Sequence, residues 1–256
     1  MRITSIGRYV FAASIIAVGF VGLVSSDFAA IWQPVPKDLP ARQILAYLCI
    51  IVSLTSGFGL LWLRTAAASA CVLLGWFLLW IVLFKIPAIA NAPWSQDSWS
   101  GLGEVAVYTA GAWVLYARFA ANRGERPFAF TRGDNGVRIA RVMYGLALVP
   151  FGIAHFAYAK ETESLVPHWL PAHEFFAYAT GCTYILAGAA MLIGMLAQLA
   201  AVLSTAQMGL FTLLVWVPIV AAGPNTFQWN EFVISCVLTA GSWVVADSYR
   251  GLPRSG

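Results

Sequence analysis

Residues 175–230 contain no charged side chain, and no soluble fold can accommodate an uncharged stretch of this length. Sixty per cent of the chain is apolar and 10% is charged, well below the roughly 25% typical of soluble domains. A helix of about 20 apolar residues crosses the hydrocarbon core of a bilayer. The sequence therefore predicts an all-α integral membrane protein.

Counting such runs predicts eight transmembrane helices. The expected spans are 9–26, 43–63, 65–84, 99–121, 142–159, 173–194, 199–217 and 231–247. The uncharged stretch 175–230 is too long for one span, and it is divided by comparison with the first half of the chain.

The second half repeats the first at an offset of about 131 residues. Residues 35–47 and 166–178 share seven of thirteen positions, including a Val-Pro pair and a Leu-Pro-Ala run. Residues 109–114 return as 239–244, and Arg8 returns as Arg141. A repeat of four helices is an even number of crossings, so the two copies are expected to be parallel. The predicted organisation is a first four-helix repeat (1–121), a basic linker (122–138) and a second four-helix repeat (139–256).

Basic residues near the helix ends predict the orientation in the membrane. Eleven of the fifteen fall on the side shared by the termini and the linker, against four on the other side. We therefore expect both termini to be cytoplasmic, in the inner (plasma) membrane of a bacterium. The positive net charge is then an orientation signal, and it does not indicate nucleic-acid binding. A cleaved signal peptide at residues 1–30 is the alternative, but alignment of this segment with residues 140–158 favours a structural helix.

The two repeats differ most at the predicted outer face of the second one. All three histidines lie there: His155, His168 and His173. An ionisable residue at membrane depth is costly and therefore indicates function. His155 lies deepest and can exchange a proton near neutral pH, with Glu174 or His173 as its partner. Glu174 equally suits the dipole at the start of its own helix, and His168 suits a solvated loop.

Aromatic side chains near His155 complete a predicted quinone site. Trp169, Tyr178 and Phe156 would hold a flat ring while His155 hydrogen-bonds a carbonyl oxygen. The histidine spacing does not favour a metal or a haem, so neither is predicted. In the first repeat, Lys85 is expected to extend toward the membrane interface, with pairing to Asp97 or Glu104 as the alternative. Trp32, Trp94 and Trp169 are expected at the interface as well.

Residues 144–156 (Tyr-Gly-Leu-Ala-Leu-Val-Pro-Phe-Gly-Ile-Ala-His-Phe), the segment Val166-Pro-His-Trp-Leu-Pro171 and residues 178–181 together resemble the DoxX-like membrane family. The resemblance covers about 40 residues well. It implies a four-helix unit associated with membrane redox chemistry, of which thiosulfate:quinone oxidoreduction is one branch, and with redox partner proteins. The first half retains both Pro-containing pairs but lacks the histidine and the tryptophan.

The leading hypothesis is a quinone-interacting or redox-associated membrane subunit, a component of a quinone-linked oxidoreductase. A small-molecule transporter with its pathway between the repeats is the second hypothesis. Against it, the sequence shows neither a buried charge nor a pair of broken helices near the midplane. A non-enzymatic scaffold that binds partner proteins through the arginine-rich segment 118–141 is the third. The sequence does not indicate an oligomeric state.

Overall fold

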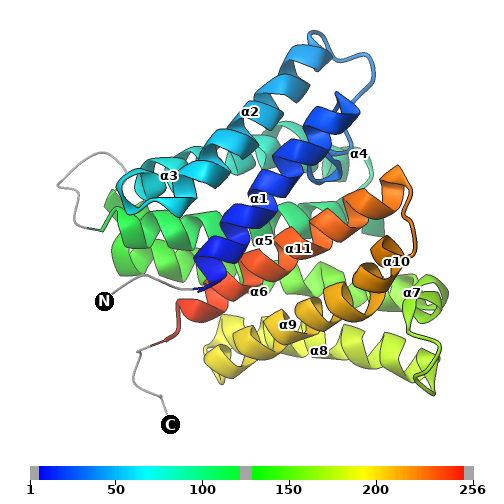
Figure 1. The fold of residues 1–256 in the computed structure, drawn as a ribbon. Helices are drawn as coiled ribbons and strands as arrows, with labels where there is room; N and C mark the ends of the chain where they lie inside the picture. Colours follow the sequence, from blue (N-terminus) through cyan, green and yellow to red (C-terminus); the bar gives the residue numbers. More distant parts are fainter. Residues whose placement is uncertain (1–5, 122–128, 251–256) are drawn as a thin grey trace.

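The structure, a computed structural model, describes residues 6–121 and 129–250, and the regular elements within these ranges are all helical (Figure 1). The first half contains four long helices and three short elements: α1 (Ile6–Ser25), η1 (Ala30–Trp32), α2 (Arg42–Leu61), α3 (Leu63–Trp80), η2 (Ile81–Lys85), α4 (Ile86–Asn91) and α5 (Gln96–Phe119). The all-helical prediction is confirmed for the part of the chain described.

The second half begins with the short helix η3 (Ala129–Thr131). It continues with α6 (Gly133–Ala157), α7 (Ala159–Leu165), α8 (His173–Ile193), α9 (Ala197–Phe211), η4 (Thr212–Trp216), α10 (Val217–Ala221) and α11 (Thr226–Asp247). Helix α6 runs without a break through Pro150, and residues 133–138 of the predicted linker are its first turns. Residues 122–128 of that linker lie outside the described part.

Both η2 and η4 are π-helices, and each is followed directly by a helix with proline at its second position. Proline has no N–H to donate to the carbonyl four residues earlier. The preceding turn widens accordingly: the N–H of Ile86 bonds the carbonyl of Ile81, and that of Val217 bonds Thr212. Single π-turns inside α-helices are often found at functional sites.

Seven helical segments of the described chain are long and apolar enough to cross a membrane. They are Ile6–Ser25, Arg42–Leu61, Leu63–Asn91, Gly133–Ala157, His173–Ile193, Ala197–Ala221 and Thr226–Asp247. Helix α5 has 24 residues but does not meet the criterion. It is packed against α3, α6 and α11, so much of its surface is covered by protein and it can carry a charged side chain.

Helices α5 and α11 cross at the centre of the molecule and are shared by two bundles. Helices α1, α2 and α3 complete the first bundle, and α6, α8 and α9 complete the second. Helix α1 packs against α11, and α6 packs against α5, so the first helix of each half contacts the last helix of the other. Each bundle therefore contains helices from both halves of the chain.

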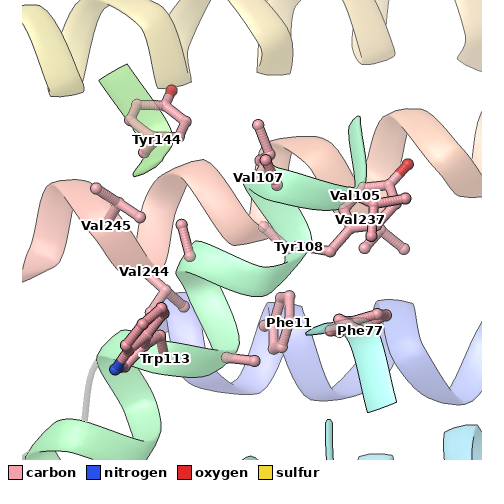
Figure 2. Close-up of a cluster of buried hydrophobic side chains, with 14 of the residues drawn as sticks. Phe11, Phe77, Val105, Val107, Tyr108, Trp113, Tyr144, Val237, Val244 and Val245 are labelled. Carbon is pink, nitrogen blue, oxygen red and sulfur yellow. The ribbon is translucent and has the colours of Figure 1, made fainter. Parts of the chain in front are cut away.

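The central crossing is close because two glycines meet there. A Cβ on Gly111 of α5 would lie 2.9 Å from the Cα of Gly241 in α11. Figure 2 shows α5 passing between Phe11 and Phe77 on one side and Tyr144 on the other. The Tyr144 hydroxyl is 2.9 Å from the Ser204 hydroxyl, which ties the core of the second bundle to α9.

Candidate functional site

The interior of the first bundle is filled by the loop that follows α1. Trp32, at the end of η1, is 2% exposed; its ring stacks on Phe77 at a centroid distance of 5.4 Å and meets the edge of Trp80 at 5.1 Å. The indole N–H of Trp80 donates to the Trp32 carbonyl over 2.9 Å. The prediction that Trp32 lies at the membrane interface is wrong, because its loop folds back into the bundle. Trp94 and Trp169 are 97% and 70% exposed.

Lys85 closes the same interior from η2. It is 3% exposed, and its ammonium donates to the Gln33 carbonyl over 2.6 Å. The expectation that Lys85 extends toward the interface is therefore wrong: its partner is a backbone oxygen inside the protein. The alternative pairing is supported, because the ammonium interacts electrostatically with the Glu104 carboxylate.

The interior of the second bundle is not filled in this way. It contains a cavity of about 860 Å³, with walls from α5, α6, α8, α9, η4, α11 and the segment from α7 to Leu170. Most of its lining is apolar. The polar lining includes Glu104, His155, Tyr184, Gln207, Glu231 and Ser235.

The cavity opens between α8 and α9 toward the outside of the bundle. Its lining includes Leu186 of α8 and Leu203 and Leu210 of α9, which are 67%, 58% and 55% exposed. Leucines exposed along two membrane-length helices face lipid when the protein is in a bilayer. A lipid-soluble compound can therefore reach the cavity without leaving the membrane.

His155 lies two residues before the end of α6, on the cavity wall. Its Nδ1 is 2.7 Å from the Phe151 carbonyl oxygen. A carbonyl can only accept, so Nδ1 carries the hydrogen and, in the neutral ring, Nε2 is left as an acceptor. The ring centroid is 5.4 Å from that of Tyr184. Glycines 152 and 181 allow this approach of α6 and α8: a Cβ on Gly152 would lie 2.6 Å from the Gly181 carbonyl oxygen.

The other predicted site residues lie elsewhere. Phe156 and Tyr178 stack on each other at 5.9 Å, both are exposed, and neither they nor Trp169 line the cavity. His173 is half-buried and Glu174 is exposed, and they too are absent from its lining.

The ring of His168 is 6.3 Å from that of His173. In the described part of the chain, no three His, Cys, Asp or Glu side chains gather as a metal-ion site would require.

At the outer end of α6, the Tyr158 hydroxyl donates to Oδ1 of Asp97 over 2.8 Å. This hydrogen bond raises the pKa of Tyr158, because removing the proton would place two negative oxygens side by side. The contact joins the end of α6 to the start of α5 and fixes both helices where they border the cavity.

Two cavity residues were missed as site candidates from the sequence: Glu104 of α5 and Glu231 of α11. Both are half-buried and line the cavity. Their carboxylates interact electrostatically with each other. A charged side chain within an apolar run was the available signal, but only packing shows that the two residues share a cavity with His155.

The long apolar helices and the cavity open to lipid are those of a helical integral membrane protein. Residues 136–217 match the DoxX family model, so the second half of the chain carries a DoxX domain, as the resemblance predicted. The matched segment includes His155 but neither Glu104 nor Glu231. Neither a curated protein nor a solved structure gave a match.

Proposed function

We propose that this protein binds a quinone or a similar membrane-soluble ring compound in the cavity of the second bundle. The observation that carries the proposal is the cavity itself, which is apolar, open to lipid and lined by a histidine whose Nε2 is a hydrogen-bonding atom. The chain would then be the quinone-binding membrane subunit of an oxidoreductase, with electrons supplied by a redox partner protein.

The size and chemistry of the cavity fit such a ligand. A volume of about 860 Å³ lies within the range of small-molecule sites, which are mostly apolar with a few placed polar groups. A protonated Nε2 of His155 donates to a ring carbonyl, and a neutral Nε2 accepts from a ring hydroxyl. The Tyr184 ring beside it provides a flat aromatic wall. An isoprenoid tail would leave between α8 and α9.

We further propose that the protein has eight spans arranged as two parallel repeats with cytoplasmic termini, in a bacterial inner membrane. Three correspondences support the repeat. The π-helices η2 and η4 are 131 residues apart, as are Ala41 and Ala172, which both precede a helix with φ 55°. The Arg141 guanidinium lies 3.7 Å from the Tyr249 ring, and that of Arg8 lies 5.7 Å from the Phe119 ring. The concentration of arginines on one side supports the orientation.

The test is mass spectrometry of organic extracts from protein purified in mild detergent. Wild type is compared with His155→Ala and with the matched control His168→Ala, whose histidine is exposed and does not line the cavity. We expect quinone to be retained by wild type and by the control, and to be lost from His155→Ala. Absence of quinone from wild type, or equal retention in all three proteins, would refute the proposal.

A small-molecule transporter is the second candidate, and two observations now favour it. The sequence lacked a recognisable buried charge or pair of broken helices, but Lys85 is buried and η2 and η4 interrupt corresponding helices. Discontinuous helices at matching positions are typical of transporters built from repeats. Net accumulation of a radiolabelled quinone analogue inside proteoliposomes, against its simple partition into protein-free liposomes, would favour transport over retention as a cofactor.

A further inference from the structure

Glu104 and Glu231 face one apolar cavity without protein partners of their own. In the described ranges, neither carboxylate makes a hydrogen bond to another residue, and the two interact electrostatically. Ionised carboxylates at membrane depth are costly unless they are paired or bound to a cation. The arrangement therefore needs compensating positive charge.

The surrounding elements supply only part of that charge. Lys85 of η2 interacts with Glu104, but for Glu231 no charged partner is recorded. Helix α6 contributes His155, whose Nδ1 bonds a backbone carbonyl, and α8 contributes Tyr184. The lining residues of α9 include Gln207 and Ser204 and none that ionises. One ammonium thus faces two carboxylates.

A buried hydroxyl on α5 is a second sign that something binds here. Tyr108 is 0% exposed, and its hydroxyl has no hydrogen-bond partner, although buried hydroxyls are normally paired. It lies one turn after Glu104 and is within electrostatic reach of both carboxylates. Figure 2 shows it at the central crossing, on the stretch of α5 that faces Phe77.

We propose that Glu104 and Glu231 form a proton-binding site of the cavity, in which Lys85 compensates Glu104 and one proton is held at Glu231. Bound in this way, the three groups are neutral together. Lys85 acts as a positioning residue, because its bond to Gln33 fixes the ammonium beside Glu104. The site would replace the proton exchange that the sequence assigned to His173 and Glu174.

Proton binding and ligand binding are then linked. A neutral ring in the cavity displaces water from Glu231 and favours its uncharged form, so binding takes up a proton from solution when Glu231 is ionised. Affinity for a neutral ligand falls by up to about tenfold for each pH unit over which the proton is released. This linkage rests on the proposed function, whereas the proton site itself does not.

The proton site is tested first without any ligand. Infrared difference spectroscopy of the full chain detects the carbonyl stretch of a protonated carboxyl group. We expect the band near neutral pH in wild type, its loss in Glu231→Gln and its persistence in the control Glu174→Gln, which alters an exposed carboxylate. A band missing from wild type, or unchanged in both Glu231→Gln and Glu104→Gln, would overturn the proposal.

The linkage is tested by calorimetric titration with a short-chain quinone in buffers of different ionisation enthalpy. We expect wild type to take up a proton on binding at alkaline pH, and Glu231→Gln to bind the same quinone with no uptake. Binding by wild type without uptake at any pH would overturn the linkage. Failure of wild type to bind the quinone at any pH would refute the proposed function and the linkage, while the infrared result would still decide the proton site.

Discussion

Replacing Trp32 with alanine removes a side chain that fills the first bundle. Trp32 is 2% exposed and packs on Phe77 and Trp80, so no neighbour can close the space without moving. Truncation of a buried tryptophan costs about 3–5 kcal/mol, a range that includes lost aromatic contacts of about 0.5–1.5 kcal/mol each. The hydrogen bond from the Trp80 indole survives, because its acceptor is the Trp32 backbone carbonyl.

The loss is measured by thermal unfolding in detergent micelles, followed by far-ultraviolet circular dichroism. At about 2–4 °C per kcal/mol, the expected decrease in Tm is about 6–20 °C. Trp94→Ala is the matched control: Trp94 is 97% exposed, and its removal should change stability by no more than about 0.5 kcal/mol. Equal Tm values for the two variants would refute the reasoning that the η1 loop plugs the bundle.

Two further substitutions test the helix crossing and the outer loop by the same unfolding measurement. A Cβ in Gly188→Ala would lie 2.7 Å from the Gly145 carbonyl oxygen, so we expect a loss of about 1–3 kcal/mol. Gly75→Ala, with nothing within 4 Å, should be neutral or stabilising by up to about 1 kcal/mol, and similar losses in both would contradict the crossing. The hydrogen bond from Arg42 holds the pKa of Asp27 below its ordinary value of 3.8, so this stabilisation is present above that pH and is lost as pH falls through the lowered pKa. Because the Asp27 side chain is 41% exposed, Asp27→Asn should cost less than about 1 kcal/mol at pH 7 and nothing in strong acid; a difference that persists at low pH would refute the pairing.

The helices were predictable because bilayer thickness turns each charge-free run into one element. His155 was predictable for the same reason, since an ionisable group in such a run must have a use. The partners of His155 were not predictable, because Glu104 and Glu231 belong to helices that reach the second bundle only through the packing of α5 and α11. Trp32 was misplaced because a tryptophan at a helix end is as typical of the membrane interface as of a loop folded inward.

Each half of this chain contributes its last helix to a core that it shares with the other half. A single four-helix unit would leave the inner faces of these helices uncovered, and it could bury them only by pairing with a second copy of itself. The fused chain thus has the contact pattern of a two-fold homodimer whose subunits have become free to diverge. One bundle has acquired an aromatic plug and the other has kept an opening. A fragment limited to residues 136–217 would lack the acidic wall of that opening.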